Sequence, residues 1–319
     1  MDNLYIVMYH YTRDLSHSRY PNIKGLDLPL FREQIQFFKK NFSIVTMEEA
    51  IEAFKGNAPL PERALLLTFD DGYIDNYTCA FPILDEEKIQ GSFFIPGKSF
   101  TTHQLLDVNK IHFILERASN VTELLENVCK LMNHYRGNEF CFPSNEELYQ
   151  HYAKPNRFDG KEIRFIKQML QTVLPDRVRV PILNDLFHKY VDISEEKLAC
   201  ELYMTYEQVR TLHRHGMYIG VHGYDHYWLG NLPKEQMQQD ISKALDIMDE
   251  FIDRKQWVMS YPYDSLNTDV TDYIKSRGAC LGFTAQKGIA NLSSHPLKLP
   301  RLDCNDFPPV SENYQRKDA

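Results

Sequence analysis

Eight apolar runs of strand length recur along this chain. They are residues 4–9, 42–46, 64–69, 91–96, 217–221, 257–261, 280–284 and 297–302. Helical patterns separate several of them, over 29–40, over 47–54 with Thr46 as the expected N-cap, and from Pro233 to Ile252. Because strands and helices alternate, we expect a mostly parallel sheet, and eight candidate strands are enough to close a barrel.

Residues 101–212 interrupt this alternation. The segment contains no strand-like run, and helical patterns cover 105–117, 121–135, 146–152, 161–174 and 177–191. Thr205 and Gln208 form a capping-box pattern that opens a further helix ending near Gly216. The connection is far longer than an ordinary βα loop. We interpret it as a helical cap over a site, with a contact between copies of the chain as the alternative.

Composition and charge narrow the range of functions. The 319 residues suffice for one large α/β domain with an insertion, and the 43% hydrophobic content is ordinary for a globular protein. The net charge of −8 argues against a nucleic-acid partner. We find no apolar run of about 18 residues and no basic leader, so neither a membrane span nor a signal peptide is expected. Six cysteines without a C-x-x-C pair fit reduced thiols, which predicts a cytoplasmic protein.

Two adjacent carboxylates, Asp70 and Asp71, follow the apolar run at 64–69. Buried charge is costly unless a metal, a proton or a partner compensates it. The pair therefore indicates a site where one carboxylate binds a cation and the other handles protons. Asp-Asp-Gly is also a common turn sequence, so this pattern alone leaves a plain turn open.

Two histidines, His222 and His226, follow the apolar run at 217–221. At this spacing both imidazoles can reach one ion, and imidazole with carboxylate suits zinc, cobalt, nickel or iron. Other strand ends carry His10 and Tyr263. The carboxyl ends of parallel barrel strands form the catalytic face, so we expect all these side chains to converge there.

With these motifs assembled, the chain resembles the polysaccharide deacetylases of carbohydrate esterase family 4. Residues 68–72 match the family's first motif, T-F-D-D-G, without change. Residues 222–226 are similar to the second, H-[ST]-x-x-H, with Gly223 in place of the hydroxyl residue. Residues 261–263 resemble the third motif in its Y-P-Y form.

The resemblance implies an α/β fold, a distorted (β/α) barrel of about seven strands with a large helical insertion. The expected organisation is a barrel from 1–100 and 213–307, an insertion or cap at 101–212, and a loose tail at 308–319.

Residue roles follow from the same resemblance. It implies that Asp70 is the general base and that Asp71, His222 and His226 hold one divalent metal ion, with zinc expected first. The usual third motif carries an arginine that supports the base, but Ser260 stands at that position, and Arg301 is our candidate for the missing charge.

The family's late histidine, its general acid, is not recognisable in this chain. We therefore choose His10 as its replacement. Tyr263, Tyr261 and Tyr73 flank the motifs and are the expected substrate-binding residues. The expected reaction is hydrolysis that removes an acetyl or formyl group from an N-acylated sugar, which we expect to be an intracellular glycan precursor.

Two other functions remain open at this point. A non-haem iron oxygenase also uses two histidines and one carboxylate, although it needs no second aspartate beside the ligand. A non-catalytic carbohydrate-binding relative would keep the fold without the chemistry, and Ser260 is its best support.

Overall fold

A closed ring of seven parallel strands forms the body of the protein. The computed structural model describes residues 3–137 and 140–315. The strands are β1 (Asn3–Tyr9), β5 (Ala64–Asp70), β6 (Ser92–Ile95), β7 (Tyr218–Val221), β8 (Trp257–Ser260), β9 (Ala279–Lys287) and β11 (Leu299–Asp303). The ring runs β1-β11-β9-β8-β7-β6-β5 and closes where β5 pairs with β1. The predicted (β/α) barrel is confirmed.

Four shorter strands lie outside the ring. β4 (Ser43–Ile44) pairs only with β5, and β10 (Ala290–Asn291) lies antiparallel to β1. β2 (Thr12–Arg13) and β3 (Leu26–Asp27) form a separate small sheet. The predicted strand at 42–46 is therefore real but does not belong to the barrel wall, because its chain turns into a helix after two paired residues.

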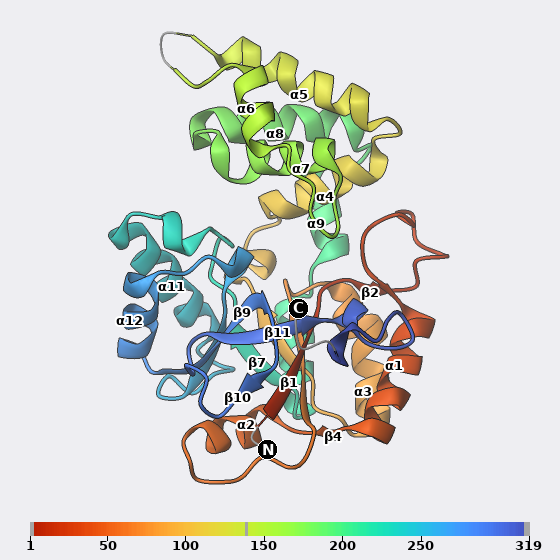
Figure 1. Ribbon diagram of the computed structural model, residues 1–319, viewed down its shortest axis with the longest axis vertical. Helices are drawn as coiled ribbons and strands as arrows, with labels where there is room; N and C mark the ends of the chain where they lie inside the picture. Colours follow the sequence, from red (N-terminus) through yellow and green to blue (C-terminus); the bar gives the residue numbers. More distant parts are fainter. Residues whose placement is uncertain (1–2, 138–139, 316–319) are drawn as a thin grey trace. The chain divides into compact units, whose positions relative to one another are not determined.

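Helices cover the outside of the ring. They are α1 (Leu28–Asn41), α3 (Phe81–Glu87), α10 (Tyr206–Arg214), α11 (Lys234–Met248) and α12 (Thr268–Ser276), with α1 and α3 on one side and α11 and α12 on another (Figure 1). The buried residues of α2 (Met47–Phe54) instead pack in one cluster with inward-facing strand residues such as Leu66. Thr46 caps α2 and Thr205 forms a capping box, both as predicted, and Thr46 completes a reciprocal capping box as well. The helix expected to reach Ile252 ends at Met248, and the sequence pattern missed α3 and α12.

Alternate residues of each strand face two different hydrophobic clusters. On β5, Leu66 faces the barrel interior together with Val258 and Leu299, whereas Leu67 and Phe69 face the helices. Since side chains alternate along a strand, every second residue shares one face. This parity decides which residues can meet inside the ring.

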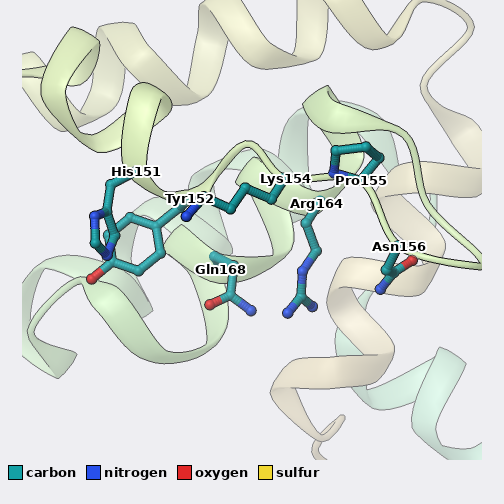
Figure 2. Close-up of a pocket in the computed structure, with 7 residues that line it drawn as sticks. All are labelled: His151, Tyr152, Lys154, Pro155, Asn156, Arg164 and Gln168. Atoms are coloured by element: carbon teal, nitrogen blue, oxygen red, sulfur yellow. The ribbon is translucent and has the colours of Figure 1, made fainter.

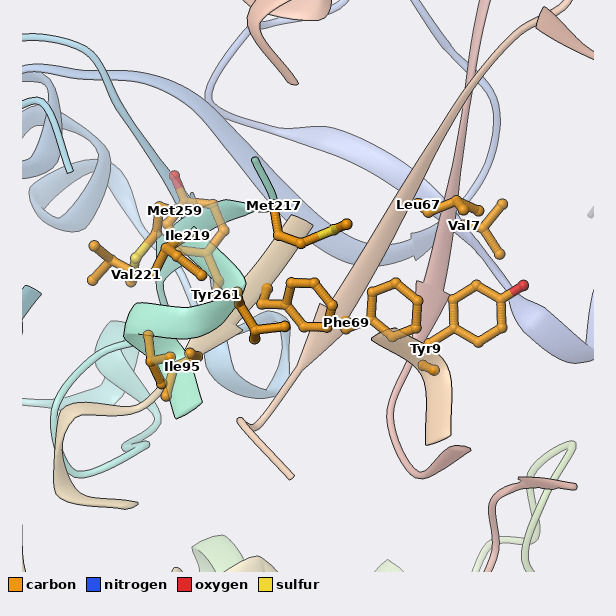
Figure 3. Close-up of a cluster of buried hydrophobic side chains, with 14 of the residues drawn as sticks. Val7, Tyr9, Leu67, Phe69, Ile95, Met217, Ile219, Val221, Met259 and Tyr261 are labelled. Carbon is orange, nitrogen blue, oxygen red and sulfur yellow. The ribbon is translucent and has the colours of Figure 1, made fainter. Parts of the chain in front are cut away.

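The outer cluster contains a stack of three aromatic rings. Phe69 lies between Tyr9 and Phe93, with ring centroids 4.9 Å apart on both sides and all three side chains fully buried. Figure 3 shows the Tyr9 and Phe69 rings next to each other among the aliphatic side chains of this cluster. The stack links β1, β5 and β6 beneath the helices.

A second compact unit consists of Arg19–Ile23 and Leu105–Leu198. Its helices are α4 (Asp107–Arg117), α5 (Val121–Tyr135), α6 (Asn145–Tyr152), α7 (Lys161–Gln168) and α8 (Asp176–Tyr190), and α9 (Glu195–Leu202) leads back to the barrel unit. Its described residues contain no strand. This unit differs from the predicted 101–212 in three places. Residues 101–104 and 199–212 group with the barrel. Arg19–Ile23 belongs to the helical unit, where Tyr20 makes an edge contact with Phe113, centroids 4.7 Å apart.

One residue of the tail expected to be loose, Tyr314, is packed against the barrel unit. Tyr314 is buried, and its ring stacks on Phe307 with centroids 4.9 Å apart. Residues 316–319 lie outside the described part. Among the described helices, none has both the length and the apolar character needed to cross a membrane.

We predict that Phe69→Ala lowers the free energy of unfolding by about 3–5 kcal/mol, because it removes the middle ring of the buried stack and leaves a cavity. Urea unfolding followed by circular dichroism measures the change. Phe158→Ala is the matched control, since that side chain is 51% exposed. Equal losses in the two variants would contradict the assignment of the stack to the core.

Candidate metal centre and active site

Three side chains with ligand atoms meet at the carboxyl ends of β5 and β7. Asp71 follows β5, and His222 and His226 follow β7. Oδ1 of Asp71 lies 3.3 Å from Nε2 of His222 and 3.2 Å from Nε2 of His226. One ligand atom from each residue lies within 4.8 Å of the others, and all three residues are buried. The structure thus brings together the three residues predicted to bind metal.

The bonding around this cluster fits a cation. Oδ1 of Asp71 is buried and accepts no hydrogen bond, which is costly for a carboxylate oxygen. Nδ1 of His222 donates to the carbonyl oxygen of Ser260 at 2.7 Å, which leaves Nε2 as the ligand atom. The donor set of two imidazoles and one carboxylate suits zinc, cobalt, nickel or iron.

The pKa shifts of Asp71 and His226 favour the deprotonated forms that bind metal. Burial alone would raise the pKa of Asp71, but its interactions with the imidazoles of His222 and His226 outweigh burial and hold that pKa well below its usual range. Burial lowers the pKa of His226. Burial also opposes the charge on His222, yet the interaction with Asp71 raises its pKa, so a cation there competes with a proton.

Left-handed backbone conformations occur at the polar ends of the strands. The φ angles of Asp71, His226, Tyr263 and Asp264 are 73°, 57°, 56° and 59°. A non-glycine residue in this region costs on the order of 1–3 kcal/mol and persists only when its surroundings enforce it. The concentration of such residues around one cluster supports a functional role for that cluster.

Asp240 on α11 supports the histidine loop. Its carboxylate accepts hydrogen bonds from the backbone N–H groups of Tyr224 at 2.9 Å and Asp225 at 2.8 Å. The loop between His222 and His226 is therefore held by a side chain that the sequence pattern did not single out. Burial raises the pKa of Asp240 to about 6.

Asp70 pairs with Arg301 inside the ring. Nη1 of Arg301 donates to Oδ1 of Asp70 at 3.0 Å, and Nη2 donates to Oδ2 at 2.7 Å. Both side chains are almost completely buried. They meet because Asp70 shares the inward face of β5 with Leu66, and Arg301 shares the inward face of β11 with Leu299.

All five N–H donors of Arg301 have acceptors within the ring. Beyond the two bonds to Asp70, Nε donates to the carbonyl oxygen of Thr284 at 2.9 Å, Nη1 to Oγ1 of Thr68 at 3.1 Å and Nη2 to Oγ of Ser260 at 3.1 Å. Oγ of Ser260 in turn donates to Asp70 at 3.2 Å. Ser260 thus bonds to both partners, at the position where the family's usual motif has its arginine.

The charge of Asp70 is stabilised by this arginine. Burial would raise the pKa of Asp70, but the charges of Arg301 and then His222 lower it below its usual value. His10 at the end of β1 is half-buried and also lowers the pKa values of Asp70 and Asp71. The structure therefore pairs Arg301 with Asp70, whereas His10 is connected to the two aspartates only through its effect on their pKa values.

The three tyrosines predicted to bind substrate occupy different environments. Tyr73 is fully buried, and its hydroxyl donates to Oδ2 of Asp71 at 2.6 Å. Tyr261 is 1% exposed, faces the outer cluster and donates to the carbonyl oxygen of Leu297 at 2.8 Å. The structure does not bring Tyr261 to the site. Side chains alternate along a strand, so Tyr261 faces outward whereas the preceding residue, Ser260, faces the inside of the ring.

Tyr263 lies beside the metal-ligand set together with a residue that sequence reasoning missed. Its ring centroid is 4.5 Å from that of His226, and it stacks on Trp228 at 4.5 Å with an interplanar angle of 5°. Both rings are partly exposed. The position of Trp228 only two residues after His226, in a chain with 2 tryptophans, was the available signal.

Comparison with known proteins identifies the family. The polysaccharide deacetylase family model matches residues 57–180 and 188–281, more than half of the chain, so the chain belongs to this family. The family prediction is confirmed. A stretch of 54 residues, 17% of this chain, is 48% identical to the poly-beta-1,6-N-acetyl-D-glucosamine N-deacetylase of Escherichia coli (strain K12). The chain covers 8% of that relative's length.

Solved structures share the fold. IcaB from Ammonifex degensii superimposes with a TM-score of 0.59 and 19% identity over 99% of this chain and 98% of that one. The deacetylase PplD of Streptococcus pyogenes, solved in complex with acetate, gives a TM-score of 0.58 and 15% identity over 98% and 96% of the two chains. At these identities the likeness shows a shared fold alone.

We predict that chelator-treated protein takes up about one divalent ion per chain and that His226→Ala abolishes this uptake, since it removes one of three ligands. Metal analysis after dialysis against zinc or cobalt measures it. His188→Ala, which removes an exposed histidine of α8, should leave uptake unchanged. Full uptake by His226→Ala would show that the ion binds elsewhere.

We further predict that Tyr73→Phe weakens metal affinity by about 10–100-fold, because its hydroxyl holds Oδ2 of Asp71 and so orients the ligand oxygen. Competition with a fluorescent zinc chelator gives the dissociation constant. Tyr77→Phe is the matched control, as that ring stacks on Phe81 and its hydroxyl is not part of the site. If both variants bind zinc like the unmodified protein, Tyr73 has no orienting role.

Proposed function

We propose that this protein is a metal-dependent carbohydrate N-deacetylase, which hydrolyses the amide of an N-acetylated or N-formylated amino sugar. Family membership supports a carbohydrate deacetylase. The single observation that carries the residue assignment is the separation of two adjacent carboxylates. Asp70 is paired with Arg301, and Asp71 is directed at two imidazoles.

The roles follow from these surroundings. Asp71, His222 and His226 would hold the ion, which would supply Lewis acidity toward the amide carbonyl and the attacking water. Asp70 accepts the proton of the attacking water, and Arg301 keeps its carboxylate ionised and oriented. The C–N bond then breaks, and the leaving amine takes a proton for which His10 is our assigned donor. The products are a carboxylate and a free amino sugar.

Tyr263 and Trp228 are our candidates for contact with the sugar. Their stacked rings lie beside His226 and are partly exposed, so an aromatic face is available next to the reacting centre. Aromatic faces pack well against the apolar face of a sugar ring, as they do against other flat or apolar groups. Tyr73 and Tyr261 are buried, and neither is proposed to touch substrate.

Two classes of substrate fit this proposal, a small precursor and a polymer. The sequence suggests a small N-acylated precursor made inside the cell. The name of the Escherichia coli relative favours a polymer of β-1,6-linked N-acetylglucosamine, through a 54-residue match that is 48% identical. Both classes present the same amide to Asp70, so the site chemistry does not depend on the choice.

Acetate or formate release from a substrate panel tests the proposal. Zinc- or cobalt-loaded protein is incubated with nucleotide-linked and free N-acetyl and N-formyl sugars and with β-1,6-linked N-acetylglucosamine oligomers. Release from any member supports the deacetylase, and relative kcat/KM values choose between precursor and polymer. No release from any of them favours a carbohydrate-binding protein, and oxygen consumption with a 2-oxo acid favours an oxygenase.

We predict that Asp70→Asn lowers kcat by about 100- to 10,000-fold, because the general base is lost. Metal content should remain near that of the unmodified protein, since Asp70 is not a ligand. Steady-state kinetics and metal analysis on the same preparation measure both quantities. Loss of the metal along with activity would assign Asp70 to the ligand set instead.

We predict that Arg301→Met moves the acidic limb of the pH profile of kcat/KM to higher pH. Arg301 lowers the pKa of Asp70 against the effect of burial, so its removal raises that pKa, and the base becomes protonated at higher pH. Arg179→Met, which removes a buried arginine paired with Asp107 in the helical unit, is the control for lost stability alone. An unshifted limb in Arg301→Met would contradict the role of Arg301.

A further inference from the structure

A pocket of about 300 Å³ lies within the helical unit, apart from the residues of the proposed reaction. It is lined by the end of α6, the loop that follows and one face of α7. The lining residues are His151, Tyr152, Lys154, Pro155, Asn156, Arg164 and Gln168 (Figure 2). All of them belong to the unit Leu105–Leu198, so the geometry of the pocket is internal to that unit.

The lining is cationic in a chain whose net charge is −8. It contains Lys154 and Arg164 and no carboxylate. Two other cations of this unit are instead neutralised: Lys167 pairs with Asp159 at 2.7 Å, and Lys110 pairs with Glu195 at 2.9 Å. Within the described part of the chain, neither Lys154 nor Arg164 has a carboxylate at ion-pair distance. Two such cations beside one cavity favour an anionic occupant.

Neighbouring side chains fix the shape of the pocket. In the amide orientation that satisfies both groups, Oε1 of Gln168 accepts from Nη1 and Nη2 of Arg164 at 3.2 and 3.1 Å. Oδ1 of Asn156 accepts from the backbone N–H groups of Phe158 and Asp159 at 2.9 and 2.8 Å, which closes the loop. A guanidinium held in place loses less freedom when it binds an anion.

An aromatic wall completes the pocket. The rings of His151 and Tyr152 make an edge contact, with centroids 4.5 Å apart, on the side toward which Lys154 extends (Figure 2). A volume of about 300 Å³ is at the lower end of the range for small-molecule sites. Lys154 and Arg164 offer positive charge to an anionic group, and the aromatic rings offer a surface to the carbon atoms of the same ligand.

We propose that this pocket binds a small ligand that carries a phosphate or carboxylate group. Arg164 and Lys154 contact the anionic group, because a guanidinium fork and an ammonium both suit such oxygens. Tyr152 packs against the carbon framework of the ligand. The proposal concerns the helical unit alone and holds whether or not the barrel is a deacetylase.

Isothermal titration of the full chain tests it, with glucose 6-phosphate, glucuronate and glucose as probes. We expect saturable binding of at least one of the two anionic sugars, weakened by added salt, and no saturable binding of glucose at the same concentrations. Binding of glucose 6-phosphate alone assigns the pocket to phosphates, and binding of glucuronate alone assigns it to carboxylates.

Substitutions in the pocket test whether the ligand binds there. Arg164→Gln and Lys154→Gln are each expected to weaken binding at least about 10-fold, in line with the loss of one charge-assisted contact. Lys130→Gln, which removes an exposed charge on α5, should leave it unchanged. Lys154 is exposed, so its substitution keeps the test valid even where Arg164→Gln fails to fold.

Four results would overturn the proposal. They are no saturable binding of either anion, equal binding of glucose, an equal loss in Lys130→Gln, and loss of binding in His226→Ala, which would place the ligand at the metal centre. Binding that persists in His226→Ala and fails in Lys154→Gln supports the pocket independently of any deacetylase activity.

Discussion

The buried ion pair of Asp70 and Arg301 is the interaction on which the rest of the site depends. It crosses the inside of the ring between β5 and β11, and the same guanidinium also bonds to residues of β8 and β9. Removing one partner of a buried pair leaves an uncompensated charge, which is strongly destabilising. Asp70 and Arg301 therefore depend on each other, and their pairing keeps the Asp70 carboxylate ionised at the catalytic face of the barrel.

A backbone constraint separates the two neighbouring aspartates. Asp70 is the last residue of β5 and follows its inward parity, whereas Asp71 has a left-handed φ of 73° and turns toward the histidine loop. Two adjacent carboxylates with a shared environment would raise each other's pKa values. Here each has its own partners, a guanidinium for Asp70 and two imidazoles for Asp71, so both can be ionised at once.

Much of this arrangement could be predicted from the sequence, because apolar runs, capping boxes and the T-F-D-D-G motif are local signals. The sequence could not show that residues 42–46 lie outside the ring, since that depends on which strands pair. Strand parity would have separated Tyr261 from Ser260, but no local signal shows that the Tyr73 hydroxyl reaches Asp71. The stacking of Trp228 on Tyr263 and the burial of Tyr314 are likewise contacts between distant segments.

The central claim is that one aspartate holds a cation while its neighbour stays free to act as a base. Anomalous diffraction from crystals soaked in zinc or cobalt tests it directly. The account predicts one ion bound by Asp71, His222 and His226, with Asp70 still paired to Arg301. An ion that recruits Asp70 away from Arg301, or a peak elsewhere with none at this cluster, would contradict it.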